Sequence, residues 1–225
     1  MRNMVLGKDT EVRAFKPSAL RLIDAAERLF GEHGIDKISL QEIAEAAGQA
    51  NKFAVQYHFK TREGLINAVF EARLPAINRR REHYVERLRA LENPTIADLL
   101  WAMIGPVVDQ IDGEGRHRYS RFASQVRIDP RYRAGWFKSR HLAAVNEVMD
   151  MLRAATPHLS PGEFNLRMVF VIDIFDSGLR LVDSPEIFVD SSSNPPMETR
   201  MLLENMVAMA AAGLSSRVKF SPMDV

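Results

Sequence analysis

The stretch Ala47–Lys60, AGQANKFAVQYHFK, decides the fold of this chain, because it is polar, basic and aromatic at once. It contains no acidic residue, and Lys52, His58 and Lys60 bring three basic side chains close together. A helix with such an outer face can donate hydrogen bonds to base edges and phosphates. The composition of the stretch therefore indicates a DNA-binding surface, provided that the neighbouring sequence supports it.

Two amphipathic helices are predicted immediately before this stretch. After Ser18, a candidate N-cap, apolar residues recur at three- and four-residue spacing over residues 19–33 until a glycine ends the pattern. Ser39 and Glu42 have the spacing of a capping box for a second, shorter helix, which ends at Gly48. Two helices thus lead directly into the stretch.

A third helix is predicted within the stretch, with Asn51 as its candidate N-cap. Three apolar side chains form its inward face: Ala54, Val55 and Phe59. Polar and aromatic side chains remain outside: Lys52, Phe53, Gln56 and Tyr57. Two short helices joined by a glycine-containing turn, the second with an exposed polar face, describe a helix-turn-helix that places its second helix in the major groove.

Residues 18–70 resemble the tetracycline-repressor (TetR) family of bacterial transcriptional regulators. The resemblance rests on three groups in fixed order: Ala25-Ala26-x-x-Leu29-Phe30-x-x-x-Gly34, Ser39-Leu40-x-x-Ile43-Ala44-x-x-Ala47-Gly48 and Tyr57-His58-Phe59-Lys60-Thr61-Arg62-Glu63-x-Leu65. The segment Gln49–Gln56 departs from the family's pattern, because it is one residue longer than usual. Counting back from Tyr57 places the extra residue in the turn, at Gln49-Ala50.

The resemblance implies DNA contacts for residues of the second and third helices and of the start of the fourth. It implies that Gln41, Lys52 and Phe53 face bases, that Gln56 and Tyr57 face bases or phosphates, and that Ser39, His58, Lys60 and Arg62 face phosphates. Asn51 completes this expected DNA-binding set. A second interpretation stays open, in which the three N-terminal helices bind a protein partner instead of DNA.

The rest of the chain predicts further helices and no strands. A fourth helix is expected from Thr61 to about Leu91, with a bend at Pro75. Later helices are expected at 95–112, 116–128, 131–155, 161–182 and 197–214, with a loop from Asp183 to Pro196. The fold class is therefore all-α, with about nine helices. We expect a flexible arm at 1–17, the helix-turn-helix domain at 18–62, an effector-binding and dimerisation domain at 63–214, and a tail at 215–225.

Composition excludes several classes of protein. The 225 residues have a net charge of +1 and no cysteine, so a disulfide framework and sulfur-ligated zinc lose support. No two histidines have metal-ligand spacing, and no nucleophile or phosphate-loop motif occurs. The sequence also shows no signal peptide and no long apolar run. We therefore expect a cytoplasmic protein that is not an enzyme and has no metal or cofactor.

The resemblance further implies that the C-terminal helices form an apolar ligand cavity. The sequence supplies many large apolar residues there, and each taken singly is more readily explained as core. Charged residues on apolar stripes suggest either polar contacts of the pocket or an internal ion-pair network. The candidate pocket residues are Phe70, Trp101, Ile104, Val108, Arg121, Phe122, Gln125, Phe137, Phe175 and Asp176.

Recognition of a palindromic DNA site by a helix-turn-helix requires two copies related by a two-fold axis. The resemblance places the dimer interface on the last two long helices, 161–182 and 197–214. The expected interface residues are Gly178, Leu202, Met206, Met209 and Ala210. The sequence thus predicts a homodimeric regulator, of repressor type, that binds a palindromic operator in double-stranded DNA and is released by a small, mostly apolar effector.

Overall fold

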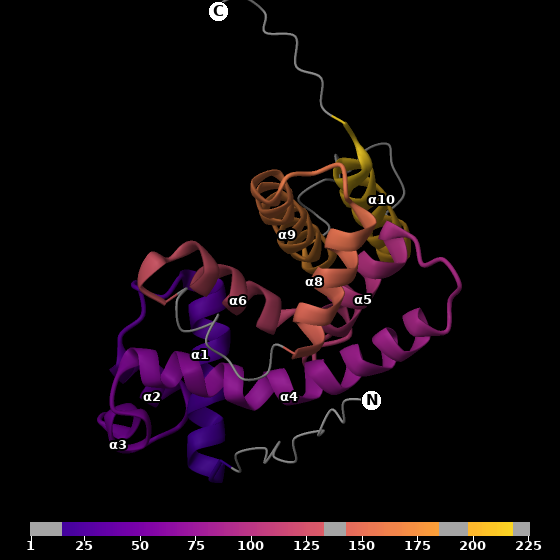
Figure 1. The fold of residues 1–225 in the computed structure, drawn as a ribbon. Helices are drawn as coiled ribbons and strands as arrows, with labels where there is room; N and C mark the ends of the chain where they lie inside the picture. The colour runs from indigo at the N-terminus through magenta and orange to yellow at the C-terminus, as the bar shows by residue number, and fades with distance from the viewer. Residues whose placement is uncertain (1–14, 133–142, 185–197, 218–225) are drawn as a thin grey trace, which may run out of the picture.

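The computed structural model describes residues 15–132, 143–184 and 198–217, and all regular structure in these ranges is helical (Figure 1). The all-α prediction is therefore confirmed for the described part of the chain. The helices are α1 (Pro17–His33), α2 (Leu40–Ala46), α3 (Ala54–Phe59), α4 (Arg62–Arg89), α5 (Ile96–Val108), α6 (Arg118–Ile128), α8 (Ala143–Ala155), α9 (Pro161–Asp183) and α10 (Thr199–Ser215).

Side-chain caps start α2 and α4 where the sequence predicts them. The backbone N–H of Glu42 donates to Ser39 Oγ at 3.2 Å, and Ser39 N–H donates to the Glu42 carboxylate at 2.7 Å, so the capping box is complete. Thr61 caps α4 by accepting from the backbone N–H of Gly64 at 3.0 Å. After α2, Gly48 has φ +64°, a left-handed conformation that suits glycine and lets the chain turn toward α3.

Two predicted caps are wrong, and both residues have other roles. Helix α1 begins at Pro17, whose fixed φ suits the first helical position, so Ser18 lies inside the first turn. Asn51 Oδ1 accepts from the backbone N–H of Phe53 at 2.9 Å and shapes the turn, while Phe53 itself occupies the N-cap position of α3. Helix α3 is therefore shorter than predicted.

The first core joins the three N-terminal helices to α4 and α6. Ile23 and Phe30 of α1, Val55 of α3 and Val69 of α4 are fully buried in it, together with Phe122 of α6. Figure 1 shows α1, α2 and α3 gathered at one end of α4, with α6 beside α1. The core is thus continuous across the boundary expected at residues 62 and 63, and the N-terminal helices do not pack by themselves.

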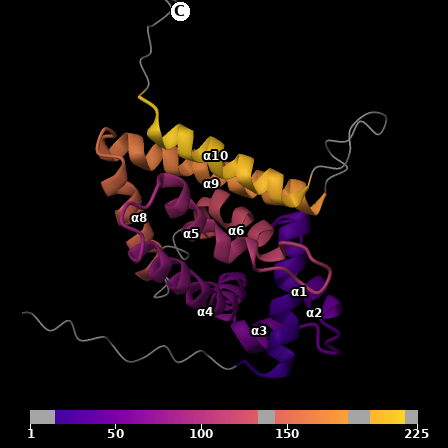
Figure 2. The same cartoon turned by 90° about the vertical axis from the view of Figure 1, so that its right-hand side faces the viewer.

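A second core occupies the other end of the molecule, between α4, α5, α8, α9 and α10. Leu100, Leu152 and Phe164 are among its fully buried members, and Leu203 joins it from α10. Helices α9 and α10 lie side by side along one edge (Figure 2). No helix in the described part of the chain is long and apolar enough to span a bilayer.

Helix α4 is the element that both cores share. Its buried residues begin with Leu65 and Ile66 in the first core and end with Val85 and Leu88 in the second. The helix continues through Pro75, which is itself buried. Helix α4 is therefore a direct connection between the two cores.

Candidate nucleic-acid interface

The outward face of α3 and the turn before it expose large side chains. The exposed fractions of Phe53 and Tyr57 are 53% and 72%, while Ala54, Val55 and Phe59 face inward and are buried, as predicted. Aromatic rings are normally buried in folded proteins. Two exposed rings, one on α3 and one at the residue just before it, therefore indicate a binding surface.

Lys52 and Gln56 lie on the same surface. Lys52 is exposed, and its Nζ lies 5.3 Å from the centre of the Phe53 ring, within range of a cation–π contact. Gln56 is half-buried, and its Oε1 has no hydrogen-bond partner among the described residues. That oxygen is itself buried, so it does not face a base edge in this structure. Gln41 and Ser39 of the preceding helix are both exposed, and Ser39 is held by its cap.

His58 and Lys60 flank the reading face at the end of α3. His58 Nε2 lies 3.2 Å from Ser18 Oγ, so the imidazole is tied to the first turn of α1. Lys60 is exposed and has φ +69°, which is unusual for a residue with a side chain. That conformation ends α3 and turns the chain directly into α4.

Arg62 has a different role from the one that the resemblance implies. One terminal nitrogen donates to the carbonyls of Ile35 and Ile38, at 2.6 and 2.8 Å, and its guanidinium lies 5.5 Å from the centre of the Phe30 ring. Arg62 therefore fastens the loop between α1 and α2 to the start of α4. We leave it out of the DNA-contacting set for this reason.

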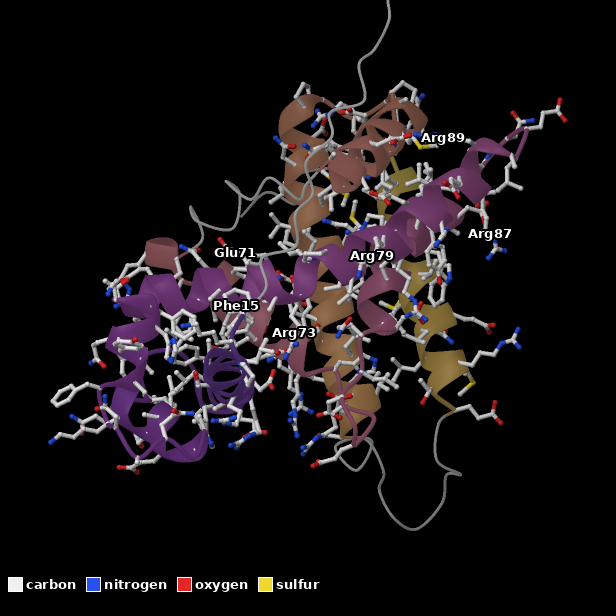
Figure 3. The ribbon with its side chains drawn as sticks, turned by 90° about the horizontal axis from the view of Figure 1, so that it is seen from below. Phe15, Glu71, Arg73, Arg79, Arg87 and Arg89 are labelled. Carbon is white, nitrogen blue, oxygen red and sulfur yellow. The ribbon has the colours of Figure 1, made fainter. Side chains whose placement is uncertain are left out.

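The run Arg79-Arg80-Arg81 on α4 does not extend the basic surface of α3. Arg80 pairs with Asp109 at 2.8 Å, Arg81 is buried, and Arg79 alone of the three is exposed without a described ion pair. Helix α4 carries the run roughly 28 Å from Lys60 at 1.5 Å per residue. Figure 3 shows Arg79 partway along α4, with further arginines toward the end remote from α3.

The described candidate pocket residues divide between the two cores. Phe70 and Phe122 pack in the first core with their ring centres 5.1 Å apart. Ile104 and Phe175 belong to the second core, and Trp101 and Val108 pack against it. Phe137 lies outside the described residues.

The charged candidates Arg121 and Asp176 are engaged in ion pairs with other residues. Arg121 donates to the buried carboxylate of Asp183 at 3.0 Å, and Arg127 pairs with Asp176. Burial raises the pKa of Asp176, and the charge of Arg127 opposes this only in part. Of the two interpretations left open by the sequence, the ion-pair network is the one present in the structure.

Asp183 was expected to begin a loop, but it ends α9 and is the centre of this network. It accepts from the backbone N–H of His117 at 3.0 Å, and its other oxygen lies 2.7 Å from His117 Nδ1. Burial acts to raise the pKa of Asp183, but the hydrogen bonds from His117 and the charge of Arg121 outweigh burial and hold that pKa below its usual value. No sequence signal identified His117 in advance, because no second histidine lies three or four residues from it.

The residues expected at a dimer interface divide into buried and exposed groups. Gly178 packs directly against the Met206 side chain, and Met206 and Ala210 are buried in the seam between α9 and α10 of one chain. Leu202 is half-buried, and Met209 is 65% exposed. We therefore leave Gly178, Met206 and Ala210 out of the expected dimer interface, because these residues already pack within one protomer.

An open cleft of about 680 Å³ lies between the α1–α2 loop and the end of α6. Gln125 is the one candidate pocket residue that lines it. Arg131 spans the cleft by pairing with both Asp36 and Asp129 at 2.5 Å. This cleft was not predictable from local sequence patterns, because its walls come from segments about ninety residues apart.

The fold and the exposed face of α3 together define a helix-turn-helix DNA-binding protein with a larger helical domain. Two family models match the chain: "Bacterial regulatory proteins, tetR family" over residues 22–69, and "Tetracyclin repressor-like, C-terminal domain" over residues 101–213. The chain belongs to the TetR family. Members of this family are transcription factors rather than enzymes, and they bind DNA and small molecules, typically as dimers.

Solved structures of TetR-family regulators share the fold at low sequence identity. A regulator from Shewanella sp. PV-4 is 14% identical, with a TM-score of 0.59, covering 89% of this chain and 99% of its own. FadR, a fatty acid degradation regulator from Bacillus halodurans, is 16% identical, with a TM-score of 0.53 and coverage of 91% and 100%. LfrR from Mycobacterium smegmatis, in complex with proflavine, is 16% identical, with a TM-score of 0.51 and coverage of 88% and 97%. A comparison with curated proteins found no match.

Proposed function

We propose that this protein is a repressor that binds a palindromic DNA site as a homodimer and releases it when a small molecule binds its C-terminal domain. One observation carries the DNA half of the proposal. Lys52, Phe53, Tyr57 and Lys60 are exposed on and beside α3, while the inward face of α3 is anchored in the first core. A rigid helix with a basic and aromatic outer face fits a major groove.

An exposed apolar surface on α9 and α10 supports the dimer. Leu166, Val169 and Phe170 of α9 are each more than half exposed and lie on one helix face. Met201 and Met209 add exposed apolar area from α10, which lies alongside α9 (Figure 2). Exposed apolar side chains on two adjacent helices favour an interaction surface, and a two-fold axis through it would pair like with like.

The shared helix α4 supports control by an effector. It begins at Arg62, directly after the reading head, and contributes buried residues to both cores. A ligand that prefers the arrangement unable to bind DNA shifts the population toward that arrangement. The related LfrR was solved with proflavine, a small aromatic molecule, and we propose a small, mostly apolar effector for this chain as well.

Selection from a library of random DNA duplexes tests the proposal directly. The full-length protein should enrich a sequence with two-fold symmetry, because each protomer of a dimer presents one copy of α3. The variant Lys52→Ala should enrich a more degenerate sequence. Recovery of no duplex above background would contradict DNA binding and favour a protein partner for the N-terminal helices.

A further inference from the structure

Arg81 is a buried cation at the junction of the two cores. It is only 4% exposed and lies on the buried stripe of α4, between Ile77 of the first core and Val85 of the second. Asn78, one turn earlier, is also buried. Two polar residues thus interrupt an otherwise apolar stripe where the DNA-binding end of the molecule meets the C-terminal end.

The guanidinium of Arg81 has fewer hydrogen-bond acceptors than it needs. One terminal nitrogen donates to Asn78 Oδ1 at 2.6 Å, and the other donates to the carbonyl of Met103 on α5 at 3.1 Å. The Nε–H is buried and has no acceptor among the described residues. A guanidinium has five N–H groups, so most of its capacity is unused in this structure.

No carboxylate in the described part of the chain forms an ion pair with Arg81, although Arg73, Arg80 and Arg89 on the same helix each have one. The connection from α6 to α8, residues 129–142, contains one acidic residue, Asp129, which pairs with Arg131. Both acceptors of Arg81 are neutral, so the positive charge is not compensated. A buried and unpaired charge lowers the free energy of unfolding by several kcal/mol, so stability alone does not explain Arg81 at this position.

The surroundings of Arg81 are aromatic and apolar. Burial lowers the pKa of Arg81 to about 10, which leaves it a cation at neutral pH. The charge of Arg81 in turn acts on buried Tyr119 of α6, although burial dominates and raises the pKa of that phenol. On α4 one turn further along, the Tyr84 ring packs against Gly105 of α5.

We propose that Arg81 binds the carboxylate of the effector, at a site between α4, α5 and α6. This inference rests on the proposed control by a small molecule and gives that molecule its chemical class, an apolar monocarboxylate. A single carboxylate matches the single uncompensated charge, and its two oxygens can accept from Nε–H and a second N–H in a bidentate pair. The apolar walls of both cores suit the remainder of the molecule.

The site also accounts for transmission to DNA. Arg81 lies on α4, whose first residues adjoin the reading head, and it holds α5 through the Met103 carbonyl. A carboxylate competes with these neutral acceptors for the guanidinium N–H groups, because charge-assisted hydrogen bonds are stronger than neutral ones. Binding therefore alters the contact between α4 and α5 at the junction of the cores.

Octanoate and benzoate serve as probes, each compared with its uncharged amide, octanamide or benzamide. The melting temperature of the full-length protein is measured with each probe, for the wild type and for Arg81→Gln, Arg81→Lys and Arg80→Gln. Arg80→Gln is the matched control, because Arg80 is the adjacent residue on α4, exposed, and paired with Asp109. Arg81→Lys retains the charge without the bidentate geometry.

We expect at least one of the two carboxylates to raise the melting temperature of the wild type and of Arg80→Gln, and its amide to raise neither. Arg81→Gln should bind that carboxylate on the order of 30-fold more weakly, as expected when one member of a buried charge pair is removed. The carboxylate affinity of Arg81→Lys should lie between those of the wild type and Arg81→Gln. Equal shifts in the wild type and Arg81→Gln, or no shift with either carboxylate, would overturn the proposal.

The stability of the ligand-free variants is a second readout. If Arg81 serves a ligand, Arg81→Gln should melt at or above the wild-type temperature, because it removes an uncompensated buried charge. A large decrease would instead indicate a structural role. DNA retention is measured on the same proteins, so that a wild type that binds DNA but shows no shift with either carboxylate counts against this inference alone.

Discussion

Arg62 and Lys60 occupy neighbouring positions at the start of α4, yet the structure gives them opposite roles. Arg62 donates inward to the carbonyls of Ile35 and Ile38, whereas Lys60 is exposed next to α3. Replacement of Arg62 by Met should leave both carbonyls without this donor and destabilise the protein by about 2 kcal/mol. Urea denaturation measures this loss, and an unchanged midpoint would contradict the structural role.

Lys60→Ala should instead leave stability unchanged and weaken binding to every DNA sequence alike, because a phosphate contact carries no base preference. Lys52→Ala should cost about 1–3 kcal/mol on the selected site and less on random duplex, because we place Lys52 at base edges. Competition binding with both duplexes distinguishes these outcomes. The same loss on both duplexes for Lys52→Ala would move that residue to the phosphate-contacting set.

The reading face could be predicted from sequence because α3 is governed by local rules. The alternation of Ala54, Val55 and Phe59 with outward polar residues specifies its orientation, and the structure agrees. The inward turn of Arg62 was not predictable in this way. Its acceptors lie 24 and 27 residues away along the chain, and only tertiary packing brings them close.

At the scale of elements, the end of α9 is fastened to the start of α6 through Asp183. His117 and Arg121 both donate to this carboxylate, and His117 Nε2 lies 3.0 Å from the Val108 carbonyl of α5. Sequence periodicity located the helices that meet here to within a few residues. It did not predict the pairing, because charged residues on an apolar stripe fit an ion-pair network and a ligand pocket equally well.

Asp183→Asn should destabilise the protein by about 2 kcal/mol at pH 5, since it removes a charged acceptor from this junction. The folded-state pKa of Asp183 lies below its usual 3.8, so its stabilisation is full above that value and is lost as the pH falls through the folded pKa. The difference in unfolding free energy between wild type and variant should therefore shrink between pH 4 and pH 3. Urea denaturation at pH 5, 4 and 3 measures it, and a constant difference would contradict the assignment.

At the scale of the whole molecule, we propose that the exposed faces of α9 and α10 pair two copies of the chain. Phe170→Glu should place two like charges near the two-fold axis and lower both dimer mass and DNA affinity. Ile111→Glu is the control, because Ile111 has a similar exposure of 54%, against 56% for Phe170, and lies in the α5–α6 connection. Analytical ultracentrifugation compares the two. A Phe170→Glu protein that stays fully dimeric would place the interface elsewhere.

The apolar seam between α9 and α10 shows why the interface residues were harder to predict than the fold. Met206 and Met209 occupy the same helix and look equivalent in sequence, yet one is 6% exposed and the other 65%. The family resemblance places the dimer interface on these two helices, and that placement stays a prediction. Which face closes the protomer and which face remains exposed depends on how α10 is rotated against Gly178 of α9.

The salt dependence of binding to the selected duplex tests the central claim, DNA binding through α3, most directly. Phosphate contacts release condensed counterions, so the logarithm of the association constant should fall linearly with the logarithm of salt concentration. For Lys60→Ala, the magnitude of this slope should be smaller by about one for each phosphate contact that the substitution removes from a protomer. An association constant that does not change with salt, or a slope that Lys60→Ala leaves unaltered, would contradict the account.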